Sequence, residues 1–221
     1  MNNAVIRVLV VDDHRLVRLG TSRLLEDIDG FEVVGQADCG EQAIEMVRDR
    51  SPDVVLMDVH MPGIGGLEAT RRCLRVDPDL KVIVLTIYEE EPYPSKLLKI
   101  GAHGYLTKRT EPAELVLAIR KVMAGQRYVS TEIAQHLALK PFNEEDGTPF
   151  DQLSSREMQI ALMIVNGHKV PEIASSLSLS PKTVNSYRYR IFDKLHVSSD
   201  VTLTRLAIKH HLLDAEVMAA G

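Results

Sequence analysis

Four short apolar runs in the first half of the chain each end in a side chain that can take part in chemistry. The polar residues are Asp12 and Asp13 after residues 7–11, Asp58 after 53–57, Thr86 after 81–85, and Lys108 after 103–107. Continuous apolar runs of this length are typical of strands that are buried on both faces of a parallel sheet. The carboxyl ends of such strands meet at one edge, where open α/β sheets bind their ligands. Only a doubly wound sheet can bring these side chains together.

Strand and helix patterns alternate as far as residue 125. We expect strands at residues 7–11, 31–37, 53–57, 82–86 and 103–107, and helices at 14–28, 40–50, 66–76, 92–100 and 112–124. This alternation predicts βαβ units and a parallel sheet. Five units within about 120 residues fit the flavodoxin-like α/β fold, with strand order 2-1-3-4-5 and a ligand site at the switch point of the sheet.

The chain of 221 residues is long enough for two domains. The alternating pattern predicts a first domain over residues 5–125. Residues 126–150 are predicted to form a linker, with a short helix at 131–139 and an acidic, turn-rich stretch from Pro141 to Pro149. A small all-helical domain is predicted over residues 151–215, with helices at 154–166, 170–177, 181–195 and 199–212.

Charge is distributed unevenly along the chain, whose net charge is −5. Residues 1–125 carry 16 basic and 20 acidic side chains, residues 126–152 carry 2 and 5, and residues 153–221 carry 8 and 6. Only the C-terminal part is basic, which permits contact with nucleic acid there. The sequence contains no apolar signal region and no apolar stretch of the roughly 18 residues that a membrane span needs. We therefore expect a soluble, cytoplasmic protein that makes no membrane contact.

The acids, the hydroxyl and the lysine at the strand ends resemble the receiver domain of two-component response regulators across residues 5–125. Met61-Pro62-Gly63, which follows shortly after Asp58, adds to the resemblance. It implies that Asp58 accepts a phosphoryl group from the phosphohistidine of a sensor histidine kinase. It also implies that Lys108 pairs with this carboxylate and later with a phosphate oxygen.

The same resemblance implies a magnesium ion and a conformational switch. Mg²⁺ prefers hard oxygen ligands and keeps several waters, so a few carboxylates are enough to bind it. The expected ligands are Asp13, Asp58, the backbone carbonyl of His60 and, through water, Asp12. In receivers the hydroxyl at the position of Thr86 moves to the phosphoryl group, and the aromatic ring at the position of Tyr105 swings inward behind it.

Each of these residues has a plainer interpretation when it is taken alone. Asp12 or Asp13 could cap the helix that follows, Asp58 could open a turn, and Lys108 could be a solvated charge. Thr86 could be an ordinary strand residue, and Tyr105 a half-buried one. The joint spacing favours the phosphorylation site, because three clustered acids without a cation would repel one another.

The C-terminal pattern predicts a helix-turn-helix over about residues 170–189. Ser154 and Glu157 form a capping box at the start of the first helix of this domain, and Ser180 followed by Pro181 marks the start of another. A short helix at 170–177, a tight turn and a longer helix at 181–195 give the helix-turn-helix layout.

The helix at 181–195 has two distinct faces. Val184, Tyr187, Ile191 and Leu195 recur at helical spacing on the face that should be buried. The residues that we expect to contact double-stranded DNA are Lys182, Thr183, Asn185, Ser186 and Tyr189 near the bases, and Arg190 and Lys194 near the phosphates. The alternative, a solvated helix face, is less favoured because residues 153–157, 173–174 and 180–184 together resemble the LuxR-type DNA-binding domain.

A receiver joined to a LuxR-type domain resembles the NarL/FixJ class of response regulators, and residues 90–98, 124–128 and 182–192 are similar to those of the GacA/UvrY group. This resemblance implies a hybrid sensor kinase of the BarA/GacS type and activation, with RNA polymerase, of genes for small regulatory RNAs. One recognition helix covers too few base pairs to define a genomic site. We therefore expect a homodimer, formed on phosphorylation, that binds an inverted repeat.

Two other classes of protein share part of this sequence pattern. A haloacid-dehalogenase-type phosphatase also uses an aspartate nucleophile at a strand end, but it needs a second acid two residues later, where this chain has His60. The chain is thus not expected to be an enzyme beyond assisting its own phosphorylation and dephosphorylation. A phosphorylation-independent transcription factor with a degenerate receiver would lack one of the acids or the lysine, and all of them are present.

Overall fold

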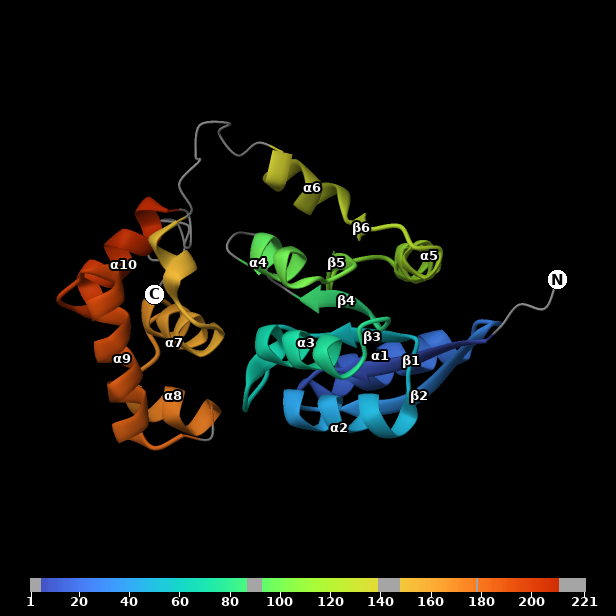
Figure 1. The fold of residues 1–221 in the computed structure, drawn as a ribbon, viewed down its shortest axis with the longest axis horizontal. Helices are drawn as coiled ribbons and strands as arrows, with labels where there is room; N and C mark the ends of the chain where they lie inside the picture. Colours follow the sequence, from blue (N-terminus) through green and yellow to red (C-terminus); the bar gives the residue numbers. More distant parts are fainter. Residues whose placement is uncertain (1–4, 87–92, 139–147, 178, 211–221) are drawn as a thin grey trace. The chain divides into compact units, whose positions relative to one another are not determined.

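The fold was analysed in a computed structural model of the chain (Figure 1), which describes residues 5–86, 93–138, 148–177 and 179–210. The chain divides into two compact units. The first contains the described residues as far as Ala138, and the second contains those from Thr148 onward. Among the described residues, none of the helices combines the length and the apolar character that crossing a membrane requires.

The first unit is built on a parallel sheet with the strand order β2-β1-β3-β4-β5-β6. Its strands are β1 (Ile6–Val11), β2 (Phe31–Ala37), β3 (Val54–Met57), β4 (Lys81–Thr86), β5 (Gly104–Thr107) and β6 (Tyr128–Val129). The predicted flavodoxin-like order of the first five strands is confirmed. The sequence pattern did not predict β6, which pairs with the outer edge of β5.

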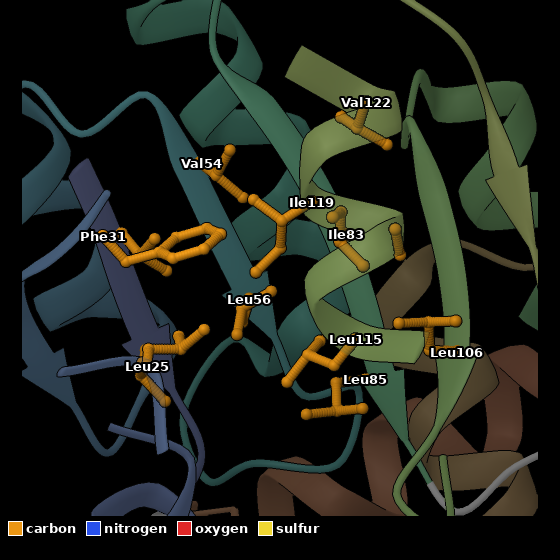
Figure 2. Packing of buried hydrophobic residues seen from close by; sticks show 13 residues of the cluster. Leu25, Phe31, Val54, Leu56, Ile83, Leu85, Leu106, Leu115, Ile119 and Val122 are labelled. Atoms are coloured by element: carbon orange, nitrogen blue, oxygen red, sulfur yellow. The ribbon is translucent and has the colours of Figure 1, made fainter. Parts of the chain in front are cut away.

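Helices cover both faces of this sheet (Figure 1). They are α1 (Arg15–Glu26), α2 (Gly40–Arg50), α3 (Gly65–Val76), α4 (Tyr93–Ile100), α5 (Pro112–Met123) and α6 (Thr131–Ala138). On one face, side chains of α1 and α5 pack against the sheet, as Figure 2 shows for Leu25, Leu115 and Ile119. On the other face, side chains of α2 and α3 form a second core.

The central strands supply both cores in alternation. In β1, Val8 and Val10 pack on the α1/α5 side, while Leu9 and Val11 pack on the α2/α3 side. Successive side chains of a strand point to opposite faces, so a strand that is buried on both faces must be apolar at every position. This explains why the strands are continuous apolar runs that end abruptly in polar residues.

The second unit is helical and consists of a short 3-10 helix η1 (Pro149–Gln152) followed by α7 (Ser155–Val165), α8 (Val170–Ser176), α9 (Pro181–Leu195) and α10 (Asp200–Lys209). Ser154 and Glu157 form the predicted capping box at the start of α7. Ser180 caps α9, where its side chain accepts a hydrogen bond from the backbone N–H of Thr183, and Pro181 follows at the first helical position. The helix-turn-helix layout of α8 and α9 is therefore present.

Several predictions fall partly outside the described residues, among them those of the acidic stretch and of the last helix. The acidic stretch that begins at Pro141 is described only from Thr148, and Pro149 is already the first residue of η1. The last predicted helix, 199–212, corresponds to α10, and positions 211 and 212 are not among the described residues.

Candidate functional site

Three carboxylates meet at the carboxyl edge of the sheet. Asp12 and Asp13 directly follow β1, and Asp58 directly follows β3, the strand that pairs with β1. Each of them has a carboxylate oxygen within 4.8 Å of an oxygen of the others and of a ring nitrogen of His14. Asp12 and Asp58 are buried, whereas Asp13 is exposed. The edge thus holds a concentrated negative charge that is partly shielded from water.

Lys108 brings a positive charge into this cluster from the end of β5. Its Nζ lies 2.7 Å from Oδ2 of Asp12 and 2.8 Å from Oδ2 of Asp58. The backbone N–H of Lys108 donates to the carbonyl of Thr86 at 2.8 Å, which continues the pairing of β5 with β4 beyond the last strand residues. One ammonium therefore contacts two carboxylates. Because three carboxylates face a single ammonium, the edge keeps an excess of negative charge that a further cation could neutralise.

The surroundings of Asp58 act on its pKa in opposite directions. Burial raises the pKa of this carboxyl, the Lys108 ammonium lowers it, and the negative charge of Asp12 raises it again, with a net value of about 6. For Lys108, burial alone would lower the pKa, but the two carboxylates outweigh it and raise the pKa above its usual value. Both side chains are consequently ionised near neutral pH.

The loop after β3 holds the carboxylate of Asp58 in place. Backbone N–H groups of Val59 and His60 donate to Oδ1 of Asp58, at 2.7 and 3.4 Å. At the start of α3, Gly66 packs so closely that a Cβ there would overlap the backbone carbonyl of Asp58. A residue larger than glycine at position 66 would therefore push the loop that follows Asp58 out of place.

Further along the same loop, the carboxylate of Glu41 in α2 accepts a hydrogen bond from the backbone N–H of Ile64 at 3.1 Å. Gly63 has a φ of 74°, a backbone conformation that glycine adopts without strain. A Cβ at Gly63 would overlap the carboxylate of Glu41, so a larger residue there would displace that carboxylate. Glu41 thus fastens the loop that carries Asp58 to α2.

The two predicted switch residues are both buried inside the sheet. Thr86 is the last residue of β4 and Tyr105 the second residue of β5, and neither side chain is exposed to solvent. Tyr105 is paired with Val84 of β4 on one side and with Val129 of β6 on the other. Tyr105 is thus fully buried, whereas the plainer interpretation had expected a half-buried strand residue.

The donor set at the sheet edge fits Mg²⁺. Three carboxylates from neighbouring strands offer hard oxygen ligands, and the uncompensated negative charge favours a divalent cation. His14 was not among the predicted site residues, although it directly follows the two acids in the sequence. Its Nδ1 lies 2.8 Å from an oxygen of Asp13, so His14 would border a cation bound by these carboxylates.

In the second unit, α9 has the two expected faces. Val184, Ile191 and Leu195 are buried, and Tyr187 is half-buried. The residues predicted to contact DNA lie away from this core: Lys182, Ser186, Tyr189 and Arg190 are exposed, and Thr183, Asn185 and Lys194 are partly exposed. Tyr189 is the one aromatic residue among these predicted contacts, and 67% of it is exposed.

Two cations of α9 have partners within the domain. Arg188 forms a two-pronged ion pair with Asp200 of α10, with distances of 2.7 and 2.8 Å, and lies over the ring of Phe192. Lys194 has its Nζ 2.6 Å from Oε2 of Glu157 in α7. By contrast, Arg190 contacts its own helix: its Nε donates to the carbonyl of Ser186 at 3.3 Å, and its guanidinium lies over the ring of Tyr187 at 4.5 Å.

Each of the two units matches a known protein family. The family of response regulator receiver domains matches residues 8–120, and the LuxR family of bacterial regulatory proteins matches residues 151–207. The chain belongs to the two-component response regulators with a LuxR-type DNA-binding domain.

Two relatives resemble this response regulator over almost its whole length. The response regulator GacA of Pseudomonas aeruginosa is 60% identical over 212 residues, which cover 96% of this chain and 99% of GacA. The response regulator UvrY of Escherichia coli is 55% identical over 217 residues, which cover 98% of this chain and all of UvrY. The predicted similarity to the GacA/UvrY group is therefore confirmed.

Solved structures resemble the response regulator as well. A LuxR-family two-component response regulator from Aurantimonas sp. SI85-9A1 is 40% identical, with a TM-score of 0.59, and covers 61% of this chain and 96% of its own. The response regulator RcsB in a complex with DNA is 27% identical, with a TM-score of 0.58, over 91% of this chain and 96% of its own.

Proposed function

We propose that this response regulator accepts a phosphoryl group on Asp58 and, once phosphorylated, binds DNA through α9 to activate transcription. The contact of the Lys108 ammonium with both Asp58 and Asp12 carries this proposal. It places an ionised nucleophile at the edge of the sheet beside a cation that can accompany a phosphate oxygen. The proposed domain division is a receiver at 5–125, a linker at 126–150 and a DNA-binding domain at 151–215.

In the proposed reaction a carboxylate oxygen of Asp58 attacks the phosphorus of a phosphohistidine. The new bond joins this oxygen to phosphorus, the phosphorus–nitrogen bond breaks, and its electron pair leaves with the imidazole of the donor. Lys108 offsets the charge of the equatorial phosphate oxygens. The N–H groups of Val59 and His60 keep the carboxylate oriented for the attack. The chain then acts as a phosphoryl acceptor rather than as an enzyme with an external substrate.

Mg²⁺ would be held by Asp13, Asp58 and the backbone carbonyl of His60, with Asp12 acting through water. When bound, it would neutralise negative charge on the phosphoryl group as that group is transferred. The chain's own residues prepare the ion's site, because the shielded carboxylates of Asp12 and Asp58 outnumber the single ammonium of Lys108.

Phosphorylation would be transmitted by Thr86 and Tyr105. Thr86 ends the strand next to β3, at the same edge of the sheet as Asp58. A shift of Thr86 toward a phosphoryl group on Asp58 would leave space that the ring of Tyr105 occupies. Tyr105 lies on β5, whose far edge pairs with β6, and the rearrangement would thereby reach the C-terminal side of the receiver.

On DNA, the exposed face of α9 would enter the major groove. Lys182, Thr183, Asn185, Ser186 and Tyr189 lie in the N-terminal half and centre of the helix, where recognition helices meet base edges. Arg190 is exposed and suited to a phosphate contact. The solved complex of RcsB with DNA, a relative of the same architecture, supports this use of the domain.

The wider role that we propose is that of the GacA/UvrY group. A hybrid sensor kinase of the BarA/GacS type would supply the phosphoryl group. The phosphorylated chain would act in the cytoplasm as a homodimer on an inverted repeat. Together with RNA polymerase, it would activate genes for small regulatory RNAs.

The phosphorylation step can be tested with radiolabelled acetyl phosphate and the full-length chain. We expect Mg²⁺-dependent labelling that Asp58→Asn abolishes, because the amide keeps the shape but not the nucleophile. Asp77→Asn, at a partly exposed acid after α3, is the matched control and should label normally. Labelling of Asp58→Asn at the normal level, or labelling that resists a chelator, would refute the assignment.

A further inference from the structure

Glu157 is a buried carboxylate that joins two parts of the DNA-binding domain. Only 3% of this residue is exposed. Its Oε2 accepts hydrogen bonds from the backbone N–H and the hydroxyl of Ser154, at 2.8 and 2.7 Å, and lies 2.6 Å from Nζ of Lys194. One carboxylate thus completes the capping box of α7 and holds a cation from the last turn of α9.

Lys194 is fastened at its backbone as well as at its side chain. The side-chain amide of Gln152 donates to the carbonyl of Lys194 at 2.5 Å, and Nζ of Lys194 lies 3.4 Å from the carbonyl of Gln152. For Glu157, burial raises the pKa, but the hydrogen bonds from Lys194 and Ser154 outweigh it and lower the pKa. The carboxylate is therefore charged under the conditions in which the protein would bind DNA.

Contact between Lys194 and a DNA phosphate would have to break this arrangement. If the ammonium swung out to a phosphate, Glu157 would lose its ion pair, and the ammonium would also give up its contact with the carbonyl of Gln152. If the ammonium stayed in place, the nearby carboxylate would cancel much of its attraction for phosphate. The exposed Arg190 faces no such conflict, because it contacts Ser186 and Tyr187 of its own helix, neither of which is charged.

We propose that Lys194 is a positioning residue for the recognition helix and not a DNA contact. Together with Glu157 it holds the C-terminal end of α9 against the start of α7, and so sets the angle at which the N-terminal half of α9 meets DNA. This inference rests on the proposed DNA-binding function of α9. It replaces the phosphate contact that the sequence alone suggested for Lys194.

The two roles predict opposite effects of Glu157→Gln. If Lys194 positions the helix, loss of the carboxylate charge loosens α9, and DNA binding weakens. If Lys194 contacts phosphate, the same change frees its charge, and DNA binding becomes tighter. The amide of glutamine can still accept the hydrogen bonds from Ser154, so the capping box is retained.

The salt dependence of binding gives a second, independent criterion. Each phosphate contact contributes about 0.9 to the slope of the logarithm of the binding constant against the logarithm of salt concentration. A positioning residue leaves this slope unchanged, although the affinity falls at every salt concentration. Lys194→Met and Glu157→Gln should each weaken binding roughly tenfold, and the double variant should be no weaker than the worse single variant.

The experiment uses the full-length chain after incubation with acetyl phosphate and Mg²⁺. Its probe is a DNA duplex selected by the wild-type chain from a random-sequence library. Arg190→Met is the control for a phosphate contact and should lower the slope by about 0.9. Lys209→Met, at an exposed position at the end of α10, removes the same charge elsewhere and should change neither the slope nor the affinity by more than about twofold.

A slope lowered by about 0.9 in Lys194→Met, or tighter binding by Glu157→Gln, would overturn the inference. If the wild-type chain selects no duplex at all, the proposed DNA-binding function fails instead, and the two failures are thus distinguishable. Circular dichroism identifies a variant that does not fold. Should Lys194→Met be such a variant, Glu157→Gln decides the question by the sign of its effect.

Discussion

The ammonium of Lys108 lies 2.8 Å from one carboxylate oxygen of Asp58, and only 2% of Asp58 is exposed to solvent. Burial by itself would favour the protonated, non-nucleophilic acid. The ammonium counteracts this, so that the pKa of Asp58 is about 6 and the carboxylate is ionised at neutral pH. Lys108 therefore supports the acceptor before any phosphoryl group arrives.

Replacing Lys108 with methionine should slow phosphorylation most strongly near neutral pH. Without the ammonium, burial and the charge of Asp12 raise the pKa of Asp58 above about 6, and fewer molecules hold the reactive carboxylate. We expect the initial rate of labelling by acetyl phosphate to fall at least tenfold at about pH 7, and its pH profile to shift upward. Lys99→Met, at an exposed position in α4, is the control. An unchanged pH profile in Lys108→Met would contradict this role.

Asp58→Asn should stabilise the metal-free protein at alkaline pH. The pKa of Asp58 is raised from 3.8 to about 6 on folding, so the folded state binds this proton more tightly than the unfolded state does. The ionised carboxylate therefore opposes folding above about pH 6, and this cost disappears as the pH falls toward 3.8.

We expect Asp58→Asn to raise the free energy of unfolding by about 1–3 kcal/mol at about pH 8, and by much less at about pH 4. The lower end of this range allows for the ion pair that Lys108 loses. Urea unfolding in the presence of a chelator measures the difference. A variant that is less stable than the wild type at alkaline pH would show that the ion pair with Lys108 outweighs the burial of Asp58.

Magnesium affinity should depend on pH through the same carboxylate. Protons compete with Mg²⁺ for Asp58, so the affinity should be nearly constant above its pKa of about 6 and fall as the pH decreases through that value. Well below the pKa, the binding constant should decrease about tenfold per pH unit. Isothermal titration calorimetry at a series of pH values provides the measurement. Asp13→Asn should weaken binding at every pH, and a pH-independent affinity in the wild type would exclude Asp58 as a ligand.

Two glycines of the receiver should respond in opposite ways to substitution by alanine. A Cβ at Gly66 would overlap the carbonyl of Asp58, so Gly66→Ala should displace the loop that follows Asp58, lower the free energy of unfolding by about 2 kcal/mol or more, and slow labelling. Gly20 lies in α1 with open space where a Cβ would be placed. Gly20→Ala should therefore stabilise the receiver by about 0.5–1 kcal/mol and leave labelling unchanged. Thermal unfolding and labelling of both variants test this contrast.

Substitutions on α9 should separate base reading from phosphate contact. Asn185→Ala and Tyr189→Ala should relax base preference at individual positions, at a cost of about 1–3 kcal/mol for the preferred base. Arg190→Met should weaken binding to all sequences alike. Selection from a random DNA library with each variant reports these preferences. Base preferences that survive Asn185→Ala and change in Arg190→Met would require the opposite assignment.

The architecture of the receiver could be predicted because its strands and helices carry strong local signals. Apart from Arg7 and Lys81 near their starts, the central strands β1, β3 and β4 are apolar up to the polar residue at the edge of the sheet. The meeting of Asp12, Asp58 and Lys108 follows from strand order alone, since parallel strands bring their carboxyl ends to one edge.

The features that the sequence did not reveal depend on contacts between distant segments. The strand β6 has only two residues, Tyr128 and Val129, which is too short for a periodic pattern. The partner of Lys194 is Glu157, 37 positions earlier in the chain, and the helical pattern of α9 alone gives no sign of it. His14 could have been noticed, because a possible nitrogen ligand next to two acids is itself a signal.

The short strand β6 gives the receiver a backbone link between its reaction site and its C-terminal segment. The backbone N–H of Tyr128 donates to the carbonyl of His103 at 3.0 Å, and that of Ser130 donates to the carbonyl of Tyr105 at 3.1 Å. Lys108 directly follows β5, the strand to which the departing chain is hydrogen-bonded. In space, Asp58 and residue 130 are separated by only a few neighbouring strands, although they are far apart in the sequence. A displacement of β5 would pass to the start of α6 through main-chain atoms, so this route would tolerate wide variation in the side chains of residues 128–130.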